Sequence, residues 1–348
     1  MTTTTETSPD LPGRTATAGR ARTPRRSTPA SVAICIAALA VVGVASLCIG
    51  NRWVDPLALL DASHPDHVFM DARLLRTGVG ALLGAAFGVA GAAMQGLTRN
   101  PLADTGLLGV NAGAAFAMVA GITYVGAGTI GGYIWFGFIG AGVAAVAVHL
   151  IASLGRGGAT PAKLVIAGAA VTAALSSWTT AILLMSRETI DATRRWQVGS
   201  VAGKQTDALL TALPFIVVGF VLVLGSARVL NALALGDDLA RGLGRNTTRD
   251  RLVVGLGLVL LVGASVALAG PIAFLGLLVP HLVRMQVGGD YAKVLPLSAA
   301  WGAVLMVGAD TVGRFVLPPS EIQVGVMIAV IGAPLFLVMI RRGRLGSL

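Results

Sequence analysis

The residues of this sequence that could do chemistry are few, and charge inside its apolar runs is nearly absent. Asp310 and Arg314 are the exception, four residues apart within one run. This spacing and order place the two side chains on one helix face as an ion pair. A proton- or ion-driven carrier needs carboxylates within its membrane spans. Because Asp310 has a partner near the end of its run, the pattern argues against ion-coupled transport and indicates an energy source outside this chain.

Two histidines suggest a weak metal site. His64 and His67 stand in a short polar segment with three nearby aspartates, Asp61, Asp66 and Asp71, and such residue types bind zinc. A solvated polar loop is the interpretation we favour, so no metal ligand is predicted. His281, which follows Pro280, is interpreted as a hydrogen-bonded structural residue.

No constellation of residues predicts an enzyme. The lysines Lys163, Lys204 and Lys293 all stand outside the pattern G-x-x-x-x-G-K-[ST], whose backbone and lysine would hold nucleotide phosphates. We therefore predict a chain that is not an enzyme and that binds no nucleotide through a P-loop.

The segment 229–251 is the largest polar interruption between the central apolar runs. Gly236 breaks the chain, Asp237 or Asp238 can cap the start of a short helix, and Gly244 can end it. Leu239 and Leu243 would give that helix one apolar side. Such a helix could lie on lipid or dock into a partner, and the acidic residues at its start favour docking because they disfavour an anionic lipid surface.

The composition identifies the class of protein that must position these residues. Of 348 residues, 55% are hydrophobic and only 12% are charged, about half the charge of a soluble domain. A membrane span needs about 20 apolar residues, and no segment shows the alternation of a β-barrel strand. The sequence therefore predicts an all-α, polytopic membrane protein.

Ten apolar runs follow a polar tail. Residues 1–30 are rich in Thr, Pro and Arg and predict a disordered cytoplasmic tail; residues 31–342 form the transmembrane domain, and 343–348 a second short tail. The run 252–286 is interrupted at Gly270-Pro271, which could mean a kinked helix, a re-entrant segment or a turn between two short helices. The runs are 31–50, 75–97, 106–122, 128–152, 163–186, 207–228, 252–270, 271–286, 294–315 and 321–341.

Basic residues orient the spans. With an even number of spans and both termini in the cytoplasm, 18 of the 26 Lys and Arg residues fall inside and 8 outside, as the positive-inside rule requires. The net charge of +10 is therefore explained by membrane orientation, and no nucleic acid partner is predicted. The glycines Gly80, Gly84 and Gly88, spaced by four, predict close packing of the second span against another helix.

Four ordered blocks over residues 31–342 resemble the FecCD-type permeases, the membrane subunits of ABC importers for iron–siderophore complexes, haem and cobalamin. The first block runs from Arg73-Leu-Leu-Arg76 through Gly91-Ala-Ala-Met-Gln95 to Arg99-Asn-Pro-Leu-Ala103 and Gly106-Leu-Leu-Gly109. The others are Leu233–Gly244, Ala269–Arg284, and Glu321-Ile-Gln-Val-Gly-Val with Gly332-Ala-Pro-Leu-Phe336.

The resemblance implies about ten helices in the type II ABC importer fold and a translocation pathway between two permease subunits, identical or paralogous. It also implies two cytoplasmic ATPase subunits, which bind the ATP and magnesium, and an extracytoplasmic substrate-binding lipoprotein. This chain would bind no cofactor itself and would lie in the lipid bilayer of the bacterial inner membrane. Ferric siderophores are the expected cargo, with haem or cobalamin as the alternative and an ion-coupled secondary transporter as the rival.

The resemblance also implies roles for particular residues. Arg73, Arg76 and Arg314 match outer-face arginines that pair with carboxylates of the binding protein, and Thr160 matches a segment that constricts the pore, although Pro161 departs from the family pattern there. The coupling segment that seats in the ATPase would comprise Leu235, Gly236, Asp237, Asp238, Leu239, Ala240, Arg241, Leu243 and Gly244.

Overall fold

A computed structural model describes residues 28–341 except 51, 62, 127–129, 156–159 and 186. Residues 1–27 of the predicted N-terminal tail, the predicted C-terminal tail 343–348, and residues 158 and 159 of the predicted pore segment lie outside these residues. The described chain forms thirteen α-helices and two 3-10 helices and contains no strand. They are α1 (Thr28–Cys48), η1 (Pro56–Leu59), α2 (His67–Thr98), η2 (Thr105–Leu108), α3 (Val110–Val125), α4 (Ile130–Ser153), α5 (Pro161–Met185), α6 (Arg187–Gln197), α7 (Thr206–Gly225), α8 (Ala227–Ala234), α9 (Asp237–Gly242), α10 (Thr247–Ala269), α11 (Leu275–Val287), α12 (Tyr291–Val316) and α13 (Val324–Arg341).

The prediction of an all-helical membrane protein is confirmed. In the described residues, seven helices are long and apolar enough to cross a membrane, and three shorter apolar helices, α3, α11 and α13, accompany them. Each of the ten predicted runs corresponds to one of these helices. The first helix begins at Thr28, three residues before the predicted start of its run.

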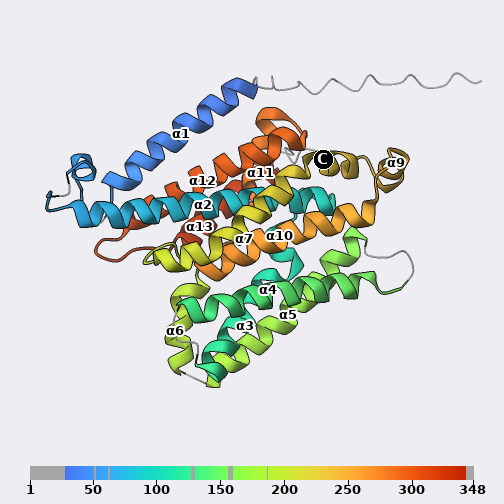
Figure 1. Ribbon diagram of the computed structural model, residues 1–348, viewed down its shortest axis with the longest axis horizontal. Coiled ribbons are helices and arrows are strands. Elements are labelled where there is room, and N and C mark those ends of the chain that lie inside the picture. Colours follow the sequence, from blue (N-terminus) through green and yellow to red (C-terminus); the bar gives the residue numbers. More distant parts are fainter. Residues whose placement is uncertain are drawn as a thin grey trace, which may run out of the picture.

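The helices form one bundle (Figure 1). Helices α2, α7, α10 and α12 run along its middle, α1 lies obliquely along one side, and α3, α4, α5 and α6 gather on the other. Helix α9 projects at one end, and α1 begins toward that same end.

The run 252–286 is divided by a turn, one of the three structures that its Gly-Pro interruption allowed. Helix α10 ends at Ala269, and the next five residues are not helical before α11 starts. Gly270 has a φ of +84°, which a side chain would strain, and Phe274 has a φ of +67°. The first turn of α11, directly after the break, packs against α2, where a β-carbon at Gly91 would overlap the backbone of Gly276.

Helices α2 and α12 are antiparallel and pack through the predicted glycines. A β-carbon at Gly84 would overlap the carbonyl oxygen of Gly302, and one at Gly88 would overlap that of Ser298. At Gly80 the nearest atom, Cγ2 of Val307, is 3.5 Å away, which is ordinary contact. Close backbone approach therefore depends on Gly84 and Gly88, and it joins the two ends of the bundle through one tight helix pair.

Helix α6 was not predicted from the sequence, because it is polar and therefore belongs to none of the apolar runs. Its signal was a stripe of Thr189, Thr193 and Trp196, which are buried at helical spacing. The indole N–H of Trp196 donates to the carbonyl of Val266 at 3.0 Å. This bond, with that from the Ser200 N–H to the Ala269 carbonyl, fixes the segment after α6 against the end of α10.

Candidate functional site

The end of the bundle opposite α9 contains a cavity of about 390 Å³ with a basic lining. Helices α2 and α12 contribute its walls, together with loop residues Gly50, Arg52, Gly203, Lys204 and Glu321. We call it the basic cavity; its charged residues are Arg52, Arg73, Arg76, Lys204, Arg314 and Glu321.

An ion-pair network joins three elements at this cavity. The guanidinium of Arg76 on α2 donates two bonds to the carboxylate of Asp310 on α12, at 2.8 and 2.9 Å. It also donates to Glu321 at 2.8 Å. The predicted pair between Asp310 and Arg314 is confirmed, at 3.3 Å. A two-pronged pair of this kind fixes geometry as well as charge, so α2 and α12 are held in register at this end.

Arg314 is buried, with 3% of its surface exposed. Its guanidinium donates to the carbonyl and the hydroxyl oxygens of Ser46 on α1, at 3.1 and 2.7 Å. It therefore lies on the floor of the basic cavity and not on the open surface, where the family resemblance had placed it. A contact between Arg314 and a docked protein stays a prediction.

Arg73 is held by uncharged groups. Its guanidinium donates to the backbone carbonyls of Leu47, Cys48 and Arg52 at 2.8 to 2.9 Å. Gly50 makes this possible, because a β-carbon there would come within 2.7 Å of the guanidinium. Arg73 thus keeps a net positive charge in a defined position.

The α9 end contains the predicted coupling helix. Gly236, with a φ of +111°, precedes it, and Gly244, with a φ of +77°, follows it, so both glycines interrupt the chain as predicted. Neither Asp237 nor Asp238 is the capping residue, since Gly236 occupies that position without a side-chain bond.

Asp237 has a different role. Its carboxylate accepts hydrogen bonds from Arg99, the residue that ends α2 in a left-handed conformation, and from Arg251 on α10 at 2.9 and 3.0 Å. Asp238 is fully exposed, and its one ion pair with a residue that the structure describes is to Arg241 at 3.6 Å. Asp237 therefore ties α9 to two long helices, and Asp238 does not.

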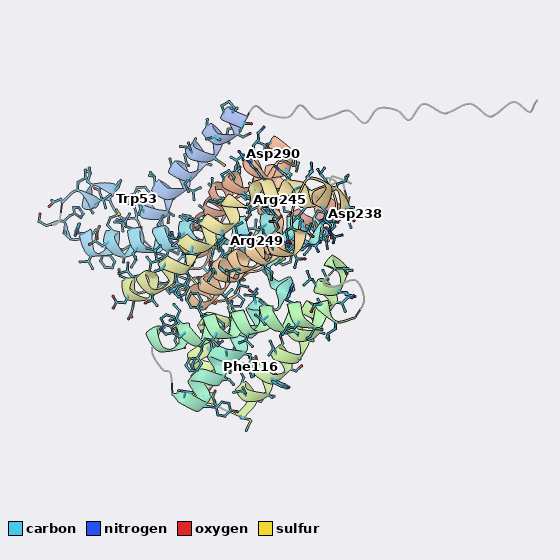
Figure 2. All side chains as sticks on the ribbon, turned by 45° about the vertical axis from the view of Figure 1, so that its right-hand side comes forward. Trp53, Phe116, Asp238, Arg245, Arg249 and Asp290 are labelled. Carbon is cyan, nitrogen blue, oxygen red and sulfur yellow. The ribbon has the colours of Figure 1, made fainter. Side chains whose placement is uncertain are left out.

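The same end is tied to α12. The Asn231 side chain on α8 donates to Asp290 at 2.8 Å and accepts from the Tyr291 N–H at 2.9 Å. The hydrogen bonds from Asn231 and from the Ala292 N–H lower the pKa of Asp290. Figure 2 shows Asp290 and Asp238 toward this side of the molecule and Trp53 at the far side.

Three leucines spaced by four are exposed around α9. Leu235, Leu239 and Leu243 are 59%, 61% and 64% exposed, whereas Ala240 is fully buried against the body of the protein. Leu239 and Leu243 were predicted to give this helix an apolar side, and both are exposed; Leu235, before the break at Gly236, is exposed as well. We call these three exposed leucines the leucine row. An exposed apolar row on an anchored element is typical of a docking surface.

Replacing Asp237 by alanine is expected to weaken coupling between α9 and the spans. Arg99 and Arg251 would lose their shared carboxylate, and we expect the backbone amides of α9 to exchange with solvent about 10- to 150-fold faster, because hydrogen bonds to a charged group contribute about 1.5–3 kcal/mol to stability. The measurement is the rate of hydrogen–deuterium exchange in residues 235–244.

The control for this prediction is Asp238→Ala, which removes the neighbouring charge without an anchor. It should change the rate less than about twofold, because exposed pairs contribute little. Equal losses in the two variants would contradict the anchoring role.

Thr160 precedes α5 and is half-buried. Its hydroxyl accepts the Lys163 N–H at 3.4 Å, and its carbonyl accepts the Leu164 N–H, so the residue closes the first turn of α5. A role for Thr160 in the pore stays a prediction.

His64 and His67, the histidines of the possible metal site, both form hydrogen bonds with nearby residues. His67 bonds the carbonyl of Ala58 and lies 3.5 Å from Asp71, while His64 accepts the Asp66 N–H. Over the described residues, no three His, Cys, Asp or Glu side chains gather in a way that could hold a metal ion.

Sequence reasoning missed three residues. Asp104 is a carboxylate that caps η2 through the Thr105 N–H at 2.8 Å and also accepts the Phe274 N–H, so it fixes the break before α11. Glu321 and Lys204 enter the basic cavity from loops. Nothing in their local sequence signals a site, because each is positioned by contacts between distant segments.

Known membrane transport proteins are similar to this chain over most of its length. The probable siderophore transport system permease protein YfiZ of Bacillus subtilis is 43% identical over 80% of this chain and 84% of its own length. The ferric enterobactin transport system permease protein FepD of Escherichia coli is 40% identical over 89% and 94%. A solved structure described as an inward-facing metal-chelate type ABC transporter matches with a TM-score of 0.80 and 27% identity over 90% of this chain and 99% of that one.

A family model covers nearly the whole described bundle. It matches residues 38–342 and describes the FecCD transport family. The match spans both the basic cavity and the α9 end, together with the helices that connect them. This chain belongs to the FecCD transport family.

Proposed function

We propose that this chain is the permease subunit of an ATP-driven importer of ferric siderophores, with the translocation pathway between it and a second permease subunit, identical or paralogous. The observation that carries the proposal is the placement of two unlike surfaces at opposite ends of one helical body. One is the exposed leucine row anchored by Asp237, and the other is the basic cavity.

The α9 end suits a cytoplasmic ATPase subunit. The leucine row offers an apolar contact, and its anchors reach α2 and α10 through Asp237 and α12 through Asn231. A push on α9 would therefore be passed to three membrane-crossing helices. ATP and magnesium would be bound by two such ATPase partners, which leaves this chain without a cofactor of its own.

The opposite end suits an extracytoplasmic binding protein with acidic side chains. Arginine guanidiniums at this end can form paired bonds to carboxylates, and a positive cavity steers an acidic partner toward it. On this orientation α9 faces the cytoplasm, in agreement with the excess of basic residues predicted for that side.

The cargo is proposed from the relatives. Relatives at 40–43% identity are named for siderophore, Fe(3+)-citrate and ferric enterobactin transport. In the described residues no cluster could hold an iron ion directly, which suits a pathway that passes the intact chelate and releases it.

The test is uptake into proteoliposomes that contain this chain, its second permease subunit, the ATPase and the binding protein. We expect import of radiolabelled ferric enterobactin or ferric citrate that requires ATP. Import of haem or cobalamin instead would overturn the cargo, and import without the ATPase would overturn the ABC mechanism.

Replacing Leu239 by aspartate in this assay is expected to raise the ATPase concentration required for half-maximal uptake about 30-fold or more. A charge would enter the centre of the apolar row, and central contacts of an interface contribute about 2 kcal/mol or more. The measurement is the ATPase concentration required for half-maximal uptake. Unchanged dependence on ATPase concentration would argue against docking through this row.

A further inference from the structure

Helices α4 and α10 run side by side (Figure 1), with a cavity of about 470 Å³ between them near the α9 end. We call it the α4–α10 crevice; Leu97 of α2 and Leu164 of α5 also line it. On α10 it extends from Leu252 to Val259, about 10 Å of helix. Both long helices are apolar and long enough to cross a membrane, so the crevice lies at the depth of lipid acyl chains, in the leaflet at the α9 end.

Two glycines open the crevice, one on each long helix. No atom lies within 4 Å of the position that a β-carbon would take at Gly142 on α4 or at Gly255 on α10. The glycines two residues away serve packing instead, because a β-carbon at Gly140 would overlap the backbone of α3 and one at Gly257 would come within 2.8 Å of Val223. Gly142 and Gly255 therefore bring no described helices together, and the space beside them is open to a ligand.

Large apolar side chains surround this space. Val146 and Leu150 of α4 and Leu252 and Leu256 of α10 line the crevice and are each more than half exposed. Because lipid tails are as apolar as leucine, such walls accommodate an acyl chain without selecting one lipid over another. An empty crevice would lose dispersion contacts along its lining. Selection among lipids must then come from the charge at the end of the crevice.

That charge is positive. Arg251 lines the crevice and shares the single carboxylate of Asp237 with Arg99. Arg249 is exposed and forms no ion pair with any residue that the structure describes. It precedes Leu252 by three residues, so the two side chains are neighbours on one side of α10. One carboxylate thus answers three guanidinium groups, and two positive charges are left uncompensated.

The nearest carboxylate in the sequence does not neutralise them. Asp250 accepts two bonds from Arg245, at 2.8 and 2.9 Å, and is paired by that guanidinium. On the facing helix, His149 lines the crevice and can add only positive charge. A basic site between membrane helices, at the end of an apolar space, is suited to the headgroup of an anionic lipid.

We propose that the α4–α10 crevice binds one acyl chain of an anionic phospholipid, whose phosphate lies against Arg249 and Arg251. The apolar walls lie deeper in the bilayer than the two arginines, in the same order as the tail and the headgroup of one lipid molecule. The chain fills the crevice, and the headgroup provides the preference for negative charge. This inference goes beyond the proposed function and depends on neither its cargo nor its ATPase.

Photolabelling tests the site in the full importer, in nanodiscs of phosphatidylcholine. The probe is a trace of phosphatidylglycerol with a diazirine in one acyl chain, and phosphatidylcholine with the same diazirine is the comparison. Labelled peptides are identified by mass spectrometry. We expect labels on segments 142–150 and 252–259, about 5- to 30-fold more from phosphatidylglycerol, the preference that one or two basic residues near a headgroup supply.

Variants separate the tail from the headgroup. Gly142→Leu and Gly255→Leu fill the crevice without meeting protein atoms, and each should lower phosphatidylglycerol labelling there to the phosphatidylcholine level. Gly43→Leu on α1 is the matched control, since no atom lies within 4 Å of its β-carbon position either, and it should change nothing. Arg249→Gln should lower phosphatidylglycerol labelling about fivefold and leave phosphatidylcholine labelling unchanged.

Three results would overturn the proposal. Equal labelling of α1 and of the crevice by both lipids would leave no specific site. Crevice labelling that is equal for the two lipids would remove the role of the anionic headgroup. Labelling of the isolated chain that disappears in the assembled importer would identify a protein subunit, and not a lipid, as the occupant.

Discussion

Replacing Asp310 by asparagine is expected to destabilise the folded protein by about 3–5 kcal/mol, the usual effect of removing one partner from a buried ion pair. The Asp310 carboxylate is the acidic partner of both Arg76 and Arg314, and Arg314 is almost completely buried. Asparagine keeps the shape of the side chain but leaves Arg314 without a negative partner. Unfolding in mixed micelles titrated with SDS measures the change in free energy.

Glu321→Gln is the matched control for Asp310→Asn. Glu321 bonds the same guanidinium of Arg76, but its side chain is 35% exposed, and a pair that water can screen contributes at most about 1 kcal/mol. Similar losses from the two variants would show that the network at the basic cavity acts as a whole, and that burial of Arg314 does not decide its energy.

Gly88→Leu is expected to prevent folding or to cost at least about 3 kcal/mol, the upper end of the usual range for overpacking. The new β-carbon would overlap the carbonyl oxygen of Ser298, and the obstacle is backbone, which cannot turn aside as a side chain can. Helices α2 and α12 would have to separate, and the register set by Arg76 and Asp310 would be lost with them. Yield of monodisperse protein and SDS unfolding both report the effect.

Gly78→Ala on the same helix is the control, since no atom lies within 4 Å of the position its β-carbon would take. It should be neutral or slightly stabilising, because alanine favours helix more than glycine does. Gly80→Ala, at 3.5 Å from Val307, should cost little. If Gly88→Leu behaved as these controls do, the close approach of α2 and α12 would not be required.

The sequence by itself determined the class of protein and much of its anatomy. Low charge and ten apolar runs are sufficient for an all-α membrane protein, because a lipid-exposed segment must satisfy its own backbone hydrogen bonds. Local signals also placed α9, since Gly236 and Gly244, the glycines predicted to interrupt the chain there, have positive φ angles on either side of the helix. The pair of Asp310 with Arg314 followed from spacing on one helix.

Only the tertiary structure decided which charges are free. Arg73 and Arg76 are three residues apart in one motif, yet Arg76 is neutralised from α12 and from Glu321 while Arg73 meets only carbonyls. Asp237 and Asp238 are adjacent, yet one anchors two helices and the other faces water. Lys204 stands in an ordinary loop sequence and becomes part of a basic cavity only because distant segments meet there. Ionic partners are set by distance in space, and in a helical bundle that distance depends on how helices far apart in the chain pack together.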